Sequence, residues 1–155
     1  MFNNIKAIVL FSAVSYSLNF IWEYCHAVSL YVGHRGVAFS DFTDTEYLRL
    51  ISYVSLVDML MLAAIFLLGA ILWRDFYWFK KMDSRKYSYF LGAALLLAVW
   101  VEIKGIYLYH EWAYTQAMPV IFGLGLSPLL QLPVTGLITI FCIKKPIRSC
   151  VWAGE

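Results

Sequence analysis

Hydrophobic residues gather in four long runs along the chain, separated by short polar stretches. The runs cover residues 5–32, 48–73, 87–107 and 120–143. Each is close to the roughly 20 residues that a helix needs to cross a bilayer. The first run is too long for a signal peptide, ends without a small-x-small cleavage site and continues into aromatic residues, so it too predicts a retained membrane helix.

Composition gives the same picture of the whole chain. Of the 155 residues, 62% are hydrophobic and only 14% are charged, which is far from the make-up of a soluble domain. We therefore expect an all-α fold: a single-domain integral membrane bundle of four transmembrane helices, in a plasma or inner membrane. The net charge of +2 gives no reason to expect nucleic-acid binding. Cys25, Cys142 and Cys150 have no paired spacing and are expected to be free thiols.

Basic residues predict how the bundle is oriented. They follow the second run, follow the fourth run and precede the first: Arg74, Lys80, Lys81, Arg85, Lys86, Lys144, Lys145, Arg148 and Lys6. With four spans all of these positions lie on one side, and the positive-inside rule makes that side cytoplasmic. The opposite connections, residues 33–47 and 110–119, are poor in Lys and Arg. Both termini are therefore predicted to be cytoplasmic.

Polar residues within the runs are predicted to meet in the outer leaflet. Asn19, Glu23 and His26 are spaced i, i+4, i+7 and share one helix face. Counted along the predicted spans, Asp58 and Glu102 lie at the same membrane depth as these three residues. Lys104 lies two residues from Glu102 and cannot share its face, so it is expected to snorkel or to meet another helix.

The last run is irregular, because Pro128 and Pro133 lie within it, with Ser127 and Gln131 between and beside them. Proline removes a backbone donor, and membrane helices tolerate that only against protein or a wet cavity. A kinked helix that lines a pocket fits this pattern. Gly123 and Ser127 also form a small-xxx-small pair, which favours close helix packing equally well.

Three carboxylates in one leaflet cannot all be ionised and dry, so protonation, pairing or water must relieve them. Such groups mark functional sites in membrane helices. The candidate catalytic residues are Glu23, Asp58, Glu102 and His26. The candidate substrate-binding residues are Asn19, Trp22, Trp100, Tyr107, Ser127 and Gln131. Individually, each could instead form a helix-pinning hydrogen bond, and Trp112 and Tyr114 are expected to belong to the ordinary interfacial aromatic belt.

Metal chemistry finds little support in the residue pattern. The Glu23-x-x-His26 spacing occurs in carboxylate-bridged metal sites, but those sites use two such pairs and this chain has one. Its three histidines are too few for a membrane di-iron centre. We therefore expect no metal and no cofactor. General acid/base chemistry on a membrane lipid or another hydrophobic small molecule fits the acids and the aromatic residues better.

A set of residues along the chain carries a family resemblance: Trp22-Glu23, Asp58, Glu102, the segment HEWAYTQAMP and the proline-rich last run. With this set the chain resembles small multi-pass membrane proteins, and it is distantly similar to carotenoid cyclase-type and sterol-isomerase-type membrane domains. The resemblance implies that intramembrane acids act on isoprenoid or sterol double bonds. The paired glutamates of the carotenoid cyclases are absent, so no catalytic assignment is carried over from it.

Two other classes of function remain open. A short four-helix chain with Glu23 in its first span also resembles small proton-coupled multidrug exporters, which work as dimers, although their first-helix motif is not recognisable here. A homodimeric transporter of hydrophobic or cationic solutes is therefore one alternative. The other is a non-catalytic membrane subunit whose acids and Lys104 pair with a partner helix.

Overall fold

A computed structural model describes the backbone of residues 2–149 and the side chains of residues 4–144. In chain order its elements are α1 (Phe2–Leu30), β1 (Tyr31–His34), β2 (Val37–Ala38), η1 (Phe39–Asp41), α2 (Asp44–Leu72), η2 (Trp78–Lys80), α3 (Ser84–Ile103), the π-helix η3 (Lys104–Leu108), β3 (Trp112–Tyr114), β4 (Val120–Ile121), β5 (Leu124–Gly125) and α4 (Leu126–Ser149). The four long helices are long and apolar enough to cross a membrane, as predicted. The chain is mostly helical, as expected, and the short strands that connect the helices were not predicted.

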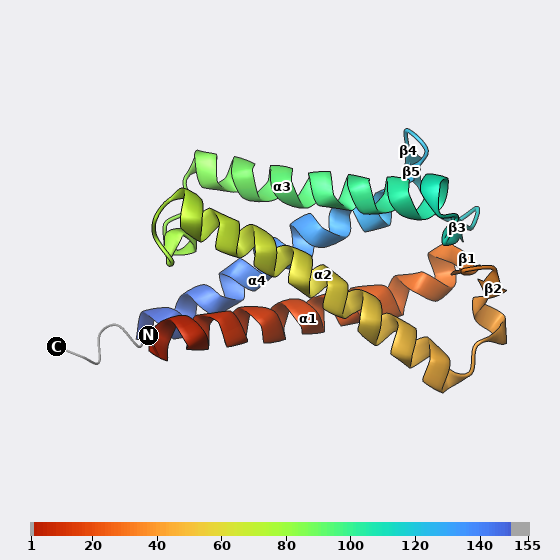
Figure 1. The fold of residues 1–155 in the computed structure, drawn as a ribbon, viewed down its shortest axis with the longest axis horizontal. Coiled ribbons are helices and arrows are strands. Elements are labelled where there is room, and N and C mark those ends of the chain that lie inside the picture. Colours follow the sequence, from red (N-terminus) through yellow and green to blue (C-terminus); the bar gives the residue numbers. More distant parts are fainter. Residues whose placement is uncertain (1, 150–155) are drawn as a thin grey trace.

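The four helices form a bundle with two different ends (Figure 1). At one end α1 begins, α4 finishes, and η2 lies in the connection between α2 and α3; we call it the aromatic end. At the other end lie all five strands, and we call it the hairpin end. There β2, β1 and β3 form a three-stranded antiparallel sheet, and β4 and β5 form a separate hairpin.

The strands explain why two helices differ from their predicted limits. Helix α1 ends at Leu30, not at residue 32, because Tyr31 begins the strand that pairs with β2 and β3. Helix α4 begins at Leu126, not at residue 120, because residues 120–125 form a hairpin. Phe122 and Gly123 at its tip have φ angles of 51° and 80°, which turn the chain back on itself.

Local capping sets the starts of the middle helices. The Thr43 hydroxyl accepts a hydrogen bond from Glu46 N at 3.3 Å, and the Glu46 carboxylate accepts one from Thr43 N at 2.9 Å. This capping box begins α2 at Asp44, four residues before the hydrophobic run. Asp83 caps α3 by accepting a hydrogen bond from Lys86 N at 2.9 Å. Pro128 is the third residue of α4, where the helix needs no backbone donor, so it requires no kink there.

Aromatic side chains fill the bundle at the aromatic end. Trp78, Phe79 and Phe90 are fully buried, and Phe66 is 1% exposed. The Trp78 indole donates a hydrogen bond to the Phe66 carbonyl at 3.0 Å, so its one polar atom is satisfied. This cluster closes the aromatic end and holds α2, α3 and α4 together there.

At the hairpin end, the π-helix brings a loop side chain against the backbone. A Cβ added to Gly105 would lie 2.0 Å from the Trp112 ring, so only glycine admits this ring. The Glu111 N–H donates a hydrogen bond to the Gly105 carbonyl at 2.7 Å, which fixes the start of the loop. The chain that leaves α3 therefore folds back over the bundle instead of running out into solvent.

We expect Gly69→Ala to destabilise the fold by about 1–3 kcal/mol, because the new methyl group would overpack the aromatic cluster. A Cβ at Gly69 would lie 2.6 Å from the Trp78 ring. Gly92→Ala is the matched control, since nothing lies within 4 Å of a Cβ there, and it should be neutral or stabilising. Thermal unfolding of both variants in the same detergent measures the difference; equal midpoints would contradict this packing.

Candidate functional site

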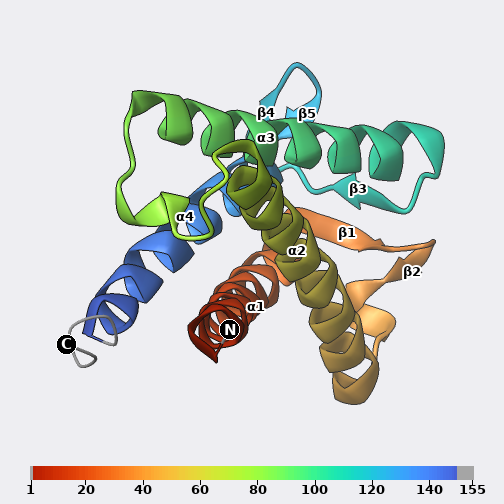
Figure 2. The same ribbon diagram turned by 60° about the vertical axis from the view of Figure 1, so that its left-hand side comes forward.

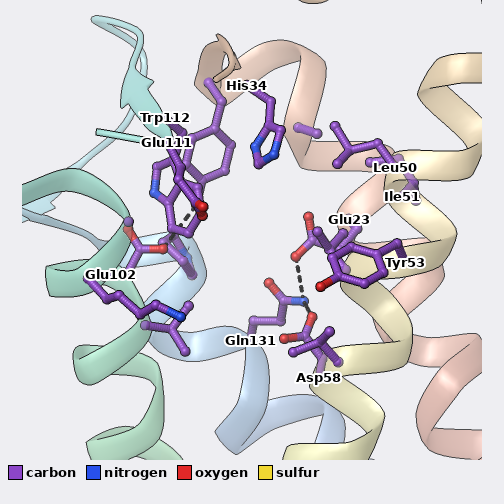
Figure 3. Close-up of a pocket in the computed structure, with 18 of the residues that line it drawn as sticks. Glu23, His34, Leu50, Ile51, Tyr53, Asp58, Glu102, Glu111, Trp112 and Gln131 are labelled. Carbon is purple, nitrogen blue, oxygen red and sulfur yellow. Dashed lines mark hydrogen bonds between the residues drawn. The ribbon is translucent and has the colours of Figure 1, made fainter. Parts of the chain in front are cut away.

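A cavity of about 500 Å³ lies at the hairpin end of the bundle (Figure 3). Residues from all four long helices and from the three-stranded sheet line it: Glu23, Ala27, Tyr31, Gly33, His34, Arg35, Phe39, Leu50, Ile51, Tyr53, Val54, Val57, Asp58, Met61, Ala98, Val101, Glu102, Lys104, Gly105, Glu111, Trp112, Pro128, Gln131 and Leu132. The predicted acids Glu23, Asp58 and Glu102 all belong to its wall. The structure therefore brings together three acids that lie on separate helices.

One amide group holds two of the acids together. Gln131 Nε2 donates to Asp58 Oδ2 at 2.7 Å and to Glu23 Oε1 at 2.8 Å. The two carboxylates come from α2 and α1 and lie within two hydrogen-bond lengths of each other, on either side of the amide in Figure 3. An amide nitrogen has only two hydrogens, and Gln131 Nε2 shares them among three acceptors, because Asn19 Oδ1 also lies 3.3 Å away.

Asn19 fixes the position of that amide. Its side chain is fully buried, and its Oδ1 atom lies 3.3 Å from Gln131 Nε2 and 3.1 Å from Thr135 Oγ1. Its Nδ2 atom donates to the Ser15 carbonyl at 2.9 Å. Because α1 and α4 are joined by these bonds, the Gln131 side chain has little freedom to leave the acids.

Glu102 faces the other two acids from the opposite wall, as Figure 3 shows. It is 3% exposed and accepts hydrogen bonds from the Tyr31 hydroxyl at 3.4 Å and from the Tyr114 hydroxyl. The Tyr114 oxygen itself accepts from Gly125 N at 2.6 Å, so its own proton points to Glu102.

The two tyrosines stay protonated over the physiological range. Burial, together with the neighbouring Glu102 carboxylate, raises the pKa of Tyr31 well above its usual value. Burial and the hydrogen bond to Glu102 also raise the pKa of Tyr114. Both hydroxyls therefore act as donors to Glu102 and do not compete with it for negative charge.

His26 presents an unused nitrogen to the acid pair. Its Nδ1 atom lies 2.9 Å from the Trp22 carbonyl, which can only accept, so Nδ1 carries a proton. The ring is 7% exposed, and Nε2 has no hydrogen-bond partner within the described part of the chain. Nε2 lies 3.8 Å from Glu23 Oε2. His26 is not part of the cavity wall, but in the neutral ring the Nε2 lone pair can receive a proton from Glu23.

An ion pair and a ring stack close the cavity at the hairpin end. Arg35 binds Glu111 Oε1 at 2.9 Å, and its backbone N–H donates to the Glu111 carbonyl at 2.6 Å. The His34 ring stacks on Trp112 with centroids 6.3 Å apart. Burial and the charge of Arg35 lower the pKa of His34, which keeps that ring neutral at pH 7.

Five of the six predicted substrate-binding residues lie outside the cavity wall. Trp100 and Tyr107 are 57% and 53% exposed, and the Tyr107 hydroxyl donates to the Gly123 carbonyl at 3.2 Å. Trp22 packs edge-on against the His26 ring, with centroids 6.5 Å apart. Ser127 is half-buried beside the cavity residue Pro128. Asn19 lies behind the wall, where it contacts Gln131, and Gln131 is the predicted substrate-binding residue that lines the cavity.

Two residues expected in an interfacial belt are part of the site instead. Trp112 lines the cavity, and Tyr114 binds Glu102. Both come from β3, whose pairing with β1 carries them back over the bundle. In the sequence they look like ordinary aromatic residues beyond a helix end, and only the long-range strand pairing distinguishes them.

Other predictions concern cysteines and metals. Cys25 and Cys142 are free and exposed, and Cys150 lies outside the described residues. Among the described residues, no three His, Cys, Asp or Glu side chains are grouped so that they could hold a metal ion. Comparison of the chain with protein-family models, curated proteins and solved structures finds no match. The case for a function therefore depends on the cavity.

We expect Gln131→Leu to destabilise the protein, because it leaves the oxygens of Glu23 and Asp58 buried without their shared donor. Losing one partner of a buried hydrogen bond costs about 1–3 kcal/mol, and more where the other group is charged. Adding Asp58→Asn to this variant supplies a new amide donor and should restore part of the loss. Thermal unfolding of both variants measures the effect; a single variant as stable as wild type would contradict the network.

Proposed function

We propose that this chain is an integral membrane protein that performs acid/base chemistry, an isomerisation or a cyclisation, on an isoprenoid-like lipid. The observation that carries the proposal is the grouping of Glu23, Asp58 and Glu102 around one largely apolar cavity, with a histidine nitrogen beside them. A proton donor and a base within reach of an apolar substrate are the requirements of such a reaction.

The proposed acid is the pair formed by Glu23 and Asp58. Two anions this close in a low-dielectric setting repel each other strongly, and one amide group cannot neutralise both. A pair that shares one proton avoids this cost. That proton is the one proposed to pass to a carbon of the substrate double bond.

Glu102 has the complementary role in this proposal. Hydrogen bonds from Tyr31 and Tyr114 favour its charged form. A carboxylate on the far wall would stabilise the carbocation that protonation creates, as would the ring faces of Tyr53 and Trp112, which also line the cavity.

The proton balance of an isomerisation closes without a cofactor. A proton leaves the Glu23–Asp58 pair and forms a C–H bond at one carbon of the double bond. An adjacent C–H bond of the cation then breaks, its electron pair forms the new double bond, and its proton returns to the Glu23–Asp58 pair, from which Glu23 can pass it to His26 Nε2 and back. The protein thereby returns to its starting state. In this scheme His26 is a proton relay.

The packed aromatic end argues against a continuous pore through the bundle, and an exporter would have to repack it. The cavity lies at the hairpin end, whereas Trp78, Phe79 and Phe90 fill the bundle at the other. A proton-coupled exporter would need access from both sides in turn. The basic residues between α2 and α3 lie at the aromatic end, so we propose that this end and both termini are cytoplasmic, in a plasma or inner membrane.

Lipid extracts from cells expressing wild type and Glu23→Gln should differ in a discrete species, because the variant lacks half of the proposed acid. Asp58→Asn should have the same effect. Asp44→Asn is the control, since Asp44 is an exposed carboxylate in the first turn of α2, outside the cavity. Mass spectrometry of the extracts makes the comparison.

Identical lipid profiles for wild type and Glu23→Gln would rule out the enzyme. A change in drug resistance or in pH-gradient-driven flux, together with an obligate homodimer, would then favour the exporter. A stable partner protein would favour the subunit.

Infrared spectroscopy of the purified protein tests the shared proton without a substrate. Wild type should show the carbonyl stretch of a protonated carboxylic acid at neutral pH. The double variant Glu23→Gln/Asp58→Asn should lose that band, whereas Glu102→Gln should keep it. A band that survives in the double variant and disappears in Glu102→Gln would reverse the proposed roles of the acids.

A further inference from the structure

The cavity lies where two of the helices separate. Helices α2 and α3 approach each other at the aromatic end and diverge toward the hairpin end (Figures 1 and 2). In its hairpin-end half α2 lies along α1, and both α2 and α3 contribute to the cavity wall there. The part of the cavity wall between α2 and α3 thus lies where the two helices diverge.

Some of the side chains that line the cavity are also exposed on the outside of the bundle. On α2, Tyr53 is 63% exposed and Val57 is 36% exposed, and the two are spaced i, i+4 on one face. Across the gap, Lys104 lines the cavity from η3 and is also exposed. These side chains lie on the side of the cavity wall where α2 and α3 diverge, and we call this side the α2–α3 portal.

The charges in the portal and in the cavity have opposite signs. Lys104 has its ammonium 5.4 Å from the Tyr109 ring centre, and the described residues supply it with no carboxylate within 4 Å. Arg35, by contrast, is paired with Glu111. Deeper inside, Glu23 and Asp58 surround Gln131. The cavity therefore has a positive charge from Lys104 at its edge, the Glu23–Asp58 pair at its base and Glu102 on the wall that also carries Lys104.

We propose that a lipid with an anionic headgroup enters sideways through the α2–α3 portal, with its head at Lys104 and its chain directed toward Glu23 and Asp58. This inference rests on the proposed function, because it requires the four helices to lie in a membrane. The acids at the base disfavour an anion there, so an anionic lipid can enter only chain first. A lysine near a helix end can extend its ammonium toward headgroups while its stem covers apolar surface.

The test uses a defined lipid as the probe. Full-length protein is reconstituted into nanodiscs of equal parts phosphatidylglycerol and phosphatidylcholine with the same acyl chains, and native mass spectrometry reads the lipids that stay bound. Wild type should retain phosphatidylglycerol in preference to phosphatidylcholine. Lys104→Ala should lower that preference about fivefold, the factor expected for one basic side chain beside an anionic headgroup. Lys104→Arg should retain it.

The portal is tested with a bulky side chain. Val57→Trp should reduce the bound lipid of either headgroup, because it fills the gap between α2 and α3. The matched control is Leu60→Trp, since Leu60 lies on the same helix, is 56% exposed and is not part of the cavity wall. The comparison requires that both variants unfold at the wild-type temperature. If Val57→Trp unfolds at a lower temperature, Val57→Phe replaces it.

Three results would overturn the proposal: no lipid retained by wild type, an unchanged preference in Lys104→Ala, or unchanged retention when the portal is filled. Its failure is distinguishable from failure of the proposed function. If the lipids behave as expected but extracts of Glu23→Gln match wild type, the portal stands and the enzyme does not. If Glu23→Gln loses a lipid species but the filled portal retains the probe, the enzyme stands and the portal does not.

Discussion

The three-way contact among Gln131, Glu23 and Asp58 is the constraint on which the rest of the hairpin end depends. Two carboxylates in an apolar bundle are costly unless hydrogen bonds and a shared proton relieve them. One amide supplies the hydrogen bonds, because Gln131 Nε2 donates to Asp58 at 2.7 Å and to Glu23 at 2.8 Å. Asn19 holds the amide in place, so α1, α2 and α4 must keep their relative positions for the acids to remain buried. The geometry of the site and the packing of these three helices therefore depend on each other.

The two ends of the bundle differ in how they are packed. At the aromatic end, Trp78 and Phe90 lie against glycines of neighbouring helices, Gly69 and Gly136, and pack without free polar atoms. Such packing depends on dense contact and gives the bundle its rigidity. At the hairpin end, the helices separate and polar side chains replace the aromatic core. A rigid base allows the separated helices to hold acids in fixed positions, which an acid/base site requires.

Local patterns predicted the four helices and the shared face of the polar residues on α1, because both depend on short-range periodicity. Run lengths indicated four helices, and the i, i+4, i+7 spacing placed Asn19, Glu23 and His26 on one face, where the structure has them. The hairpins were missed, because β4 and β5 are short and apolar and merge with the run that follows. Tyr114 and Trp112 were missed because their position depends on pairing with β1, about 80 residues earlier in the chain.

The missed residues explain why the acids differ in environment, which the sequence could not show. Three carboxylates at one depth look equivalent in a sequence, and any of them could be the proton donor. In the structure, Glu102 receives phenol donors from Tyr31 and Tyr114, whereas Glu23 and Asp58 share an amide. Donors that outnumber acids favour an anion, and acids that outnumber donors favour a shared proton. The roles of these acids can therefore be assigned only when the position of β3 is known. This strand carries no acid, but its Tyr114 binds Glu102.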